Sequence, residues 1–224
     1  VKVHNNQSLS VNRMLTNLGE ISVRSGGNLV QTASSLLTGT GQTHVVRSIS
    51  SNPLNPFHFM GIPVQGAGLN DIADDIGGFG LNAFAVSDGI NIDILTCSPL
   101  ELTTTTPYGN IFQYNETETV NCMMEGWEVR TTNAIQPGRG YAVIVPNGNS
   151  VKNSGIANNQ DLTFSGITRT NANLTAMQGF NLIGNPYPSA INWNTFRAGN
   201  ASQIQASTYR SEERRVGKEC RSRW

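Results

Sequence analysis

The sequence predicts an all-β fold, in which an antiparallel β-sandwich follows a short β-solenoid-like repetitive segment. Turn-forming and small polar residues dominate the composition, with 23 Gly and 26 Asn among 224 residues, so long helices are not expected. Short β-prone segments recur between clusters of Gly, Pro and Asn. Apolar and polar residues alternate within them, and in the run 20–24 this alternation places Ile21 and Val23 on one face of a strand.

Residues 1–50 form the predicted repetitive segment. Its β-prone pieces are SLSVN, LTN, EISVRS, NLVQT and HVVRS, and turn residues separate them. The apolar positions Leu9, Leu15, Ile21 and Leu29 recur at short intervals, as expected where each strand stacks on the preceding one. We therefore interpret this segment as the last rungs of a β-solenoid-like stack.

A cluster of Pro, Asn and Ser at 50–56 cannot continue a β-ladder and marks the start of a second domain, which we predict to span 53–200. One short helix is expected at 69–76, with Asn70 or Asp71 as its N-cap and Gly77–Gly78 as its end. About eight strands are expected in this domain, at 57–64, 81–87, 90–95, 110–116, 126–132, 140–146, 161–167 and 180–186. Their spacing favours a β-sandwich, and about 150 residues suffice to bury a full core.

Two of these strands share the frame F-x-φ-φ-G-x-P, where φ is an apolar residue. They begin at Phe57 and at Phe180. In each, a glycine permits close backbone approach and a proline then ends the hydrogen bonding of the strand. Because the first and last strands of a domain often lie side by side, we expect these two segments to close the sandwich together.

The last fifteen residues, 210–224, differ in composition from the rest of the chain. They read RSEERRVGKECRSRW, hold six Lys or Arg and three Glu, and resemble a translated sequencing adapter. We expect a non-native tail and exclude it from the fold. The remainder keeps 9 of the 15 basic and 12 of the 15 acidic side chains, a formal charge of −3. This balance excludes a basic nucleic-acid-binding protein.

Cysteine usage leaves one candidate disulfide. Once Cys220 is set aside with the tail, Cys97 and Cys122 remain. Their spacing of 25 residues would close a loop worth about 3 kcal/mol when oxidised. The alternative is a pair of free thiols that pack as small apolar side chains.

Three motifs carry a resemblance to a known group of proteins. They are SGGNL at 25–29, PGRGYA at 137–142 and GFNLIGNPYPSAINW at 179–193, of which GNPYPSAINW is the most specific. In order and spacing, most of residues 9–196 resembles secreted and cell-surface proteins of Bacteroidetes. In that family such a segment stands before a C-terminal sorting domain recognised by the type IX secretion system. No sorting domain follows here, because the chain runs into the charged tail. The resemblance implies an extracellular or outer-cell-surface location.

The sequence carries no catalytic signature, so we expect that the protein is not an enzyme. Its three histidines lie in different segments without metal-ligand spacing. His58 alternates with two phenylalanines, which predicts a solvent-facing position on a strand. No G-x-S-x-G motif occurs, and the glycines Gly138 and Gly140 precede a strand instead of the helix N-terminus of a phosphate site. No apolar run approaches the roughly 18 residues of a membrane span.

Calcium is the one cofactor that the sequence suggests. Oxygen-bearing side chains alternate along a turn and strand at Asp88, Asn91 and Asp93, and calcium takes many such ligands. A second acidic group lies beside the Gly pair that ends the expected helix, at Asp71, Asp74 and Asp75. The alternative for both groups is a solvated acidic loop.

Four aromatic residues near turns are the candidates for ligand binding, namely Trp127, Tyr141, Tyr187 and Trp193. Planar rings on a rim can stack on sugar faces, and core packing explains the same rings.

We expect a structural or adhesive module of a surface protein, whose partners are other domains of the same protein. The alternative is a carbohydrate-binding module for polysaccharide capture, with glycans as partners.

Overall fold

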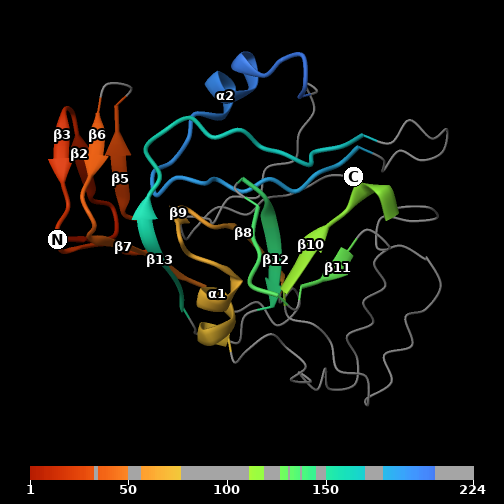
Figure 1. The fold of residues 1–224 in the computed structure, drawn as a ribbon, viewed down its shortest axis with the longest axis horizontal. Helices are drawn as coiled ribbons and strands as arrows, with labels where there is room; N and C mark the ends of the chain where they lie inside the picture. Colours follow the sequence, from red (N-terminus) through yellow and green to blue (C-terminus); the bar gives the residue numbers. More distant parts are fainter. Residues whose placement is uncertain are drawn as a thin grey trace. The chain divides into compact units, whose positions relative to one another are not determined.

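The computed structural model describes residues 1–32, 35–49, 57–76, 111–118, 127–130, 132–136, 138–144, 150–169 and 179–204 (Figure 1). Strands account for 41% and helices for 11% of the structure, which confirms the predicted all-β class. By their contacts the residues form two compact units, Val1–Ser189 and Ala190–Trp224.

The first unit begins with two repeats that pair in parallel. The first repeat, residues 1–19, contains β1 (Lys2–Val3), β2 (Ser8–Val11) and β3 (Met14–Thr16). The second, residues 20–41, contains β4 (Glu20–Val23), β5 (Asn28–Gln31) and β6 (Leu36–Thr38). Each strand of the first repeat pairs with its counterpart in the second, so that Leu9 lies opposite Leu29 and Leu15 lies opposite Leu37.

The side chains that point into these repeats are apolar and buried. Val3, Ile21, Val23, Leu29 and Leu37 are each less than 8% exposed. The β-prone pieces expected here are thus confirmed as strands, but the sequence reasoning missed β1, β6 and the length of the repeat. The turns between equivalent strands differ in length, so the paired residues of β3 and β6 lie further apart in sequence than those of β2 and β5. The repeat therefore has no constant period along the sequence.

A five-stranded sheet joins the repeats to later parts of the chain. Its strand order is β1-β4-β7-β13-β9, in which β7 (Gln42–Ser48) follows β4 in parallel. The long strand β13 (Ser150–Ala157) pairs antiparallel with β7 and, at its end, with β9 (Val64–Gln65). The sheet therefore crosses the boundary predicted at residues 50–53.

The strand β13 was not predicted, and the strand expected at 161–167 is absent from that described segment. The reason lies in the residues that β13 buries. Its inward positions are Val151, Asn153, Gly155 and Ala157, of which only the valine is a strong strand former. A strand with such an inward face gives little hydrophobic periodicity, whereas the apolar residues of 161–167 alternate without pairing.

A four-stranded antiparallel sheet forms the rest of the first unit's described strands. Its strand order is β11 (Trp127–Val129), β10 (Ile111–Tyr114), β12 (Gly140–Ile144) and β8 (Phe57–Gly61). All four were predicted. The strand expected at 180–186 is reduced to one bridge, between Ile183 and Arg139. The strands expected at 81–87 and 90–95 lie outside the described residues.

Helix α1 (Leu69–Ile76) has the predicted bounds, but its N-terminus is satisfied by a distant residue. The N–H of Asn70 donates to Oδ1 of Asn133 over 2.8 Å, so the expected cap by Asn70 or Asp71 is wrong. The carboxylates of Asp71 and Asp75 instead accept the backbone N–H groups of Ser154 and Lys152 on β13. A short 3-10 helix, η1 (Glu116–Glu118), follows β10.

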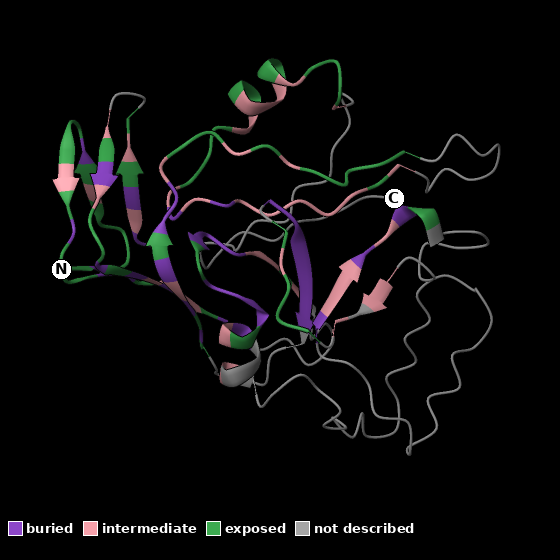
Figure 2. Ribbon diagram, viewed as in Figure 1, coloured by how far each residue is buried: buried purple, intermediate pink, exposed green. Residues whose placement is uncertain are grey.

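One core cluster takes side chains from both sheets and from α1 (Figure 2). Val23, Val45 and Val151 come from the five-stranded sheet, whereas Ile111, Tyr141 and Val143 come from the four-stranded sheet. Leu69 and Ile72 of α1 are fully buried in the same cluster. Among the described strands neither sheet closes on itself.

The second unit contains one described helix, α2 (Trp193–Gly199), which was not predicted. Asn192 is its N-cap, because Oδ1 of Asn192 accepts the N–H of Thr195 over 3.1 Å. The Asn-rich composition of this stretch concealed a good capping residue.

Candidate functional site

The three segments that carry the family resemblance meet in the first unit. The N–H of Gly140 donates to the carbonyl of Leu182, and the N–H of Gly184 donates to the carbonyl of Gly138, each over 2.9 Å. Further along the same run, the carbonyl of Pro188 accepts the N–H of Leu29 over 3.4 Å. We call these contacts the motif junction. Because backbone groups form these hydrogen bonds, the motif junction depends on the path of the chain more than on particular side chains.

A direct contact between two glycine backbones lies at the centre of the motif junction. A Cβ placed on Gly61 would lie 2.8 Å from Cα of Gly184, and one placed on Gly184 would lie 2.4 Å from Cα of Gly61. No other residue type fits this approach. The two segments with the frame F-x-φ-φ-G-x-P therefore meet at their glycines, as expected. They do not pair as strands, because β8 pairs with β12 and the second segment makes a single bridge, from Ile183 to Arg139.

Arg139 is buried in the junction, with 8% of its surface exposed. Nε donates to Oε1 of Gln136 over 3.0 Å, Nη1 donates to Oδ1 of Asn181 over 3.2 Å, and Nη2 donates to the carbonyl of Gly166. Burial lowers the pKa of this guanidinium, and the nearby Tyr141 partly opposes that shift. These three acceptors are neutral oxygens, two on side chains and one on the backbone. Arg139 thereby links its own turn to the segments that contain Gly166 and Asn181.

Tyr187, a predicted ligand-binding residue, also makes contacts within the junction. Its hydroxyl donates to the carbonyl of Gln160 over 2.8 Å, and its N–H donates to Oδ1 of Asn185. Burial, and then the charge of Asp161, raise the pKa of this phenol. Beside it, the buried amide of Asn158 donates to the carbonyl of Pro186 over 2.6 Å.

The predicted candidates Trp127 and Tyr141 lie on opposite faces of the four-stranded sheet. Tyr141 is 1% exposed and belongs to the core, and its hydroxyl accepts the N–H of Gln136 over 3.2 Å. Trp127 is half-buried and stacks on Phe59, with ring centroids 5.9 Å apart and an angle of 5° between the planes. Tyr114 meets the same indole edge-on at 5.0 Å. Of the two candidates, only Trp127 lies on the face with Phe59 and Tyr114, which we call the aromatic face.

His58 lies on the face that carries Tyr141, and this differs from the expected solvent-facing position. Its cross-strand partner is Val143, which is fully buried, and the imidazole itself is half-buried. Burial lowers the pKa of His58. Phe59, the next residue, points to the opposite face and is 42% exposed.

Trp193, the last aromatic candidate, belongs to the second unit. It is the first residue of α2 and packs on Phe196 with ring centroids 5.5 Å apart. Three positions separate the two rings, so they lie on the same face of the helix. This pairing gives Trp193 a local packing role.

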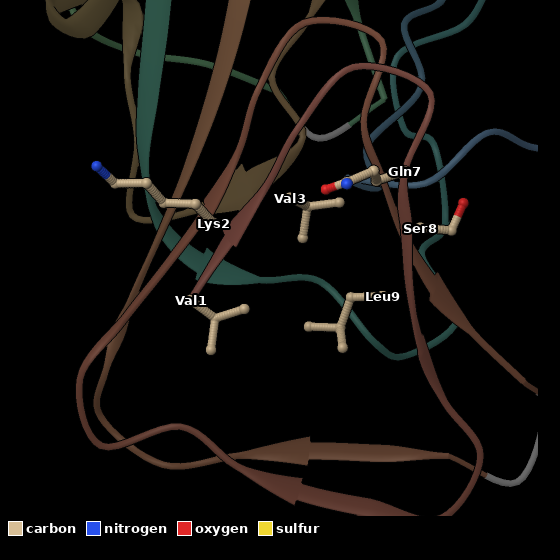
Figure 3. A pocket seen from close by; sticks show the side chains of 6 residues that line it. All are labelled: Val1, Lys2, Val3, Gln7, Ser8 and Leu9. Carbon is tan, nitrogen blue, oxygen red and sulfur yellow. The ribbon is translucent and has the colours of Figure 1, made fainter.

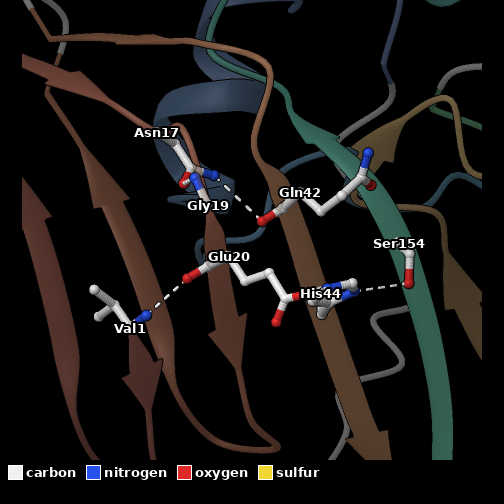
Figure 4. A network of polar contacts seen from close by, with 7 residues as sticks. All are labelled: Val1, Asn17, Gly19, Glu20, Gln42, His44 and Ser154. Carbon is white, nitrogen blue, oxygen red and sulfur yellow. Dashed lines mark hydrogen bonds and ion pairs between the residues drawn. The ribbon is translucent and has the colours of Figure 1, made fainter.

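The outer face of the five-stranded sheet carries a group of polar side chains (Figure 4). Nδ1 of His44 lies 2.9 Å from Oγ of Ser154, its cross-strand partner, and Nε2 of His44 lies 3.9 Å from Oε1 of Glu20. The Glu20 side chain is 77% exposed, so water screens its charge. Ser154 also borders a hollow of about 380 Å³, with Gln42, Gln65, Gly66, Gly155 and Ile156.

The polar face continues to the junction between the two repeats (Figure 4). Asn17 is almost fully buried, and its amide donates to the carbonyl of Gln42 while its Oδ1 accepts the N–H of Gly19. The sequence reasoning did not select Gln42, Ser154 or Asn17. Recognition that β7 continues the parallel stack after the second repeat would have aligned Glu20 with Gln42 and indicated this row.

Comparison with known protein families gives one match. Residues 94–216 match a family described as a domain of unknown function, DUF8693, and this stretch is more than half of the chain. The chain belongs to the DUF8693 family. A search of curated proteins found no match, and neither did a search of solved structures.

The DUF8693 match includes β10 to β13, Arg139 and the run 179–193, whereas the two repeats at 1–41 lie before it. Most of the motif junction is therefore part of the family domain. The contact of Pro188 with Leu29 joins that domain to the second repeat.

The remaining predicted sites lie outside the described residues. These are the calcium candidates Asp88, Asn91 and Asp93 and the disulfide candidates Cys97 and Cys122. Within the part of the chain that the structure describes, no three His, Cys, Asp or Glu side chains gather into a group that could hold a metal ion. No helix in that part is long and apolar enough to cross a membrane.

Proposed function

We propose that this DUF8693 protein is a structural or adhesive module of a secreted or cell-surface bacterial protein. One observation carries the proposal: the residues with the most specific sequence pattern make contacts inside the module. Gly184, Pro186 and Pro188 each contact a different strand or turn through backbone atoms. A motif used in this way preserves a shape, and a rigid shape is what a load-bearing or spacing module needs.

The architecture that fits this role is a β-solenoid-like stack followed by a β-sandwich. The parallel pairing of the two repeats supports the stack, because each strand adds to its counterpart. The single core shared by the two sheets supports the sandwich. A crystal structure of the chain tests both arrangements, and a closed barrel or a pair of separate cores would contradict them.

A second candidate function is carbohydrate binding, and the aromatic face of the four-stranded sheet supports it. Phe59 is 42% exposed, and the ring of Trp127 lies parallel to it. Apolar ring surface that remains in contact with water on a sheet face can stack on pyranose rings. The cross-strand partner of Phe59 on this face is Ala142, which has a small side chain.

A glycan array distinguishes these two functions. Residues 1–209 are applied with and without calcium, together with the variants Phe59→Ala, Trp127→Ala and Trp193→Ala. Tyr187→Phe is the matched control, because it removes only the hydroxyl that donates to Gln160. Binding that Phe59→Ala and Trp127→Ala abolish, but Tyr187→Phe retains, would replace the structural proposal with a carbohydrate-binding module. Silence from a folded protein in both conditions supports the structural module.

The location of the protein has its own test. We propose export to the cell surface, as the resemblance to type IX cargo implies. Protease treatment of intact cells that carry the full gene should degrade the protein, and thiol titration of the purified chain should report whether Cys97 and Cys122 are bonded. Full protection from the protease while the protein stays in the cytoplasmic fraction would refute export.

A further inference from the structure

The first repeat has one open edge. Each of β1, β2 and β3 pairs with a strand of the second repeat, and no described strand pairs with their other side. A hollow of about 400 Å³ lies at this edge and is lined by Val1, Lys2, Val3, Gln7, Ser8 and Leu9 (Figure 3). The apolar side chains of Val1, Val3 and Leu9 gather around it in Figure 3.

The backbone groups at this edge can be identified from the hydrogen bonds on the other side. The carbonyls of Val1, Val3, Gln7, Val11 and Arg13 all accept N–H groups from the second repeat or the turn after β5. Successive residues of a strand point their backbone groups to opposite sides. The N–H and carbonyl groups that face the open edge therefore belong to Lys2, Ser8, Ser10, Met14 and Thr16.

The far side of the second repeat, in contrast, is covered by the chain itself. β7 and then β13 continue the sheet from β4, and the carbonyl of Pro188 accepts the N–H of Leu29 on β5. The amide of Asn159 donates to the carbonyl of Leu37 on β6 over 2.6 Å. All three strands of the second repeat thus have partners beyond it, and the three strands of the first repeat have none among the described residues.

The open edge carries only one of the features that keep edge strands from pairing. Natural edges carry prolines, charged side chains or bulges. Here Lys2 on β1 is the only charged residue in the three strands, and none of them contains proline. Met14 is 70% exposed and Val1 is 74% exposed. Each of β1, β2 and β3 can therefore accept a further strand along its open edge.

We propose that the open edge binds a further repeat of the same kind, contributed by a neighbouring module of the surface protein. This partner is an extended segment of about 20 residues, mostly uncharged, with apolar residues at the positions of Val3, Leu9 and Leu15. Its three short strands continue the parallel ladders of β1, β2 and β3, and its apolar side chains fill the hollow. The inference rests on the structural role proposed above and names the surface through which the module joins its neighbour.

The test uses the full chain with its first repeat duplicated. A second copy of residues 1–19 is placed directly before Val1, so that it can stack on the original copy. The expected result is a higher midpoint of thermal unfolding and amide hydrogen exchange at Ser8, Ser10 and Met14 that is slower by about tenfold or more. The control is the same duplication with Ser10→Pro in the original copy, which removes an outward N–H that the existing ladder does not use. In this control, amide exchange on β2 should remain as fast as in the parent chain.

Two outcomes would overturn the inference. One is a duplicated chain whose added residues exchange freely and whose unfolding midpoint equals that of the parent. The other is concentration-dependent dimerisation of the unmodified chain in analytical ultracentrifugation that disappears on duplication, which would assign the edge to a second copy. Neither readout involves export or glycans, so failure here is distinguishable from failure of the proposed function.

Discussion

Adding a methyl group at Gly184 tests whether the contact between two glycine backbones holds the first unit together. The new Cβ would lie 2.4 Å from Cα of Gly61 and 2.9 Å from the carbonyl oxygen of Arg139. Both are backbone atoms, so no rotation of a side chain relieves the clash. Overpacking of this kind costs about 1–3 kcal/mol, and we expect the upper end, about 3 kcal/mol. At about 2–4 °C per kcal/mol, Gly184→Ala should lower the unfolding midpoint by about 6–12 °C.

Differential scanning calorimetry measures this effect directly. Gly19→Ala is the matched control, because a Cβ there meets no atom within 4 Å, and we expect a change of less than about 0.5 kcal/mol. Gly61→Ala meets the same contact from the other side, so the double variant should cost less than the sum of the two single variants. A midpoint for Gly184→Ala within about 1 °C of the parent would refute the reasoning, because the backbones would then have room to separate.

Three further predictions concern single side chains. Asn158→Ala leaves the buried carbonyl of Pro186 without its donor, so the free energy of unfolding in urea should fall by about 1–3 kcal/mol, and an unchanged midpoint would contradict this role. Tyr187→Phe removes only the hydrogen bond to Gln160 and should cost about 0.5–1.5 kcal/mol by the same measurement; a loss greater than that of Asn158→Ala would reverse the ranking. Burial lowers the pKa of His58 from its ordinary value of 6.5, so the unfolded state takes up a proton more readily and the free energy of unfolding falls as the pH drops below 6.5. Replacement by glutamine should flatten that fall between about pH 7 and pH 5, and parallel curves for the two proteins would exclude the effect.

Local patterns in the sequence were sufficient where one residue type decides the structure. The helix at 69–76 had the predicted bounds, with a glycine pair next in the sequence. The strand predicted at 57–64 was right in its start but ends at Gly61, the glycine of its own frame. The frame F-x-φ-φ-G-x-P correctly predicted that two distant segments meet. In each case the signal was a glycine or proline, whose backbone preferences do not depend on distant contacts.

Features that depend on distant partners were not predictable from local patterns. The strand β13 buries Asn153 and Gly155, and β7 makes a strand of this segment by pairing with it. At the N-terminus of α1, the N–H of Asn70 donates to Oδ1 of Asn133, which lies 63 residues further along the chain. The polar row on the five-stranded sheet required the parallel register, which follows from pairing and not from hydrophobic periodicity.

The pairing of β7 with β13 has a consequence for how the protein unfolds. Six residue pairs join these strands, from Ser48 with Ser150 to Thr43 with Gly155, and α1 covers the other side of β13 with two carboxylates. A fragment that begins after residue 50 would lack β7 and expose the whole inner edge of β13 to solvent or to other chains. The repeats and the sheets should therefore melt in one cooperative transition, and expression fragments of this protein should keep both.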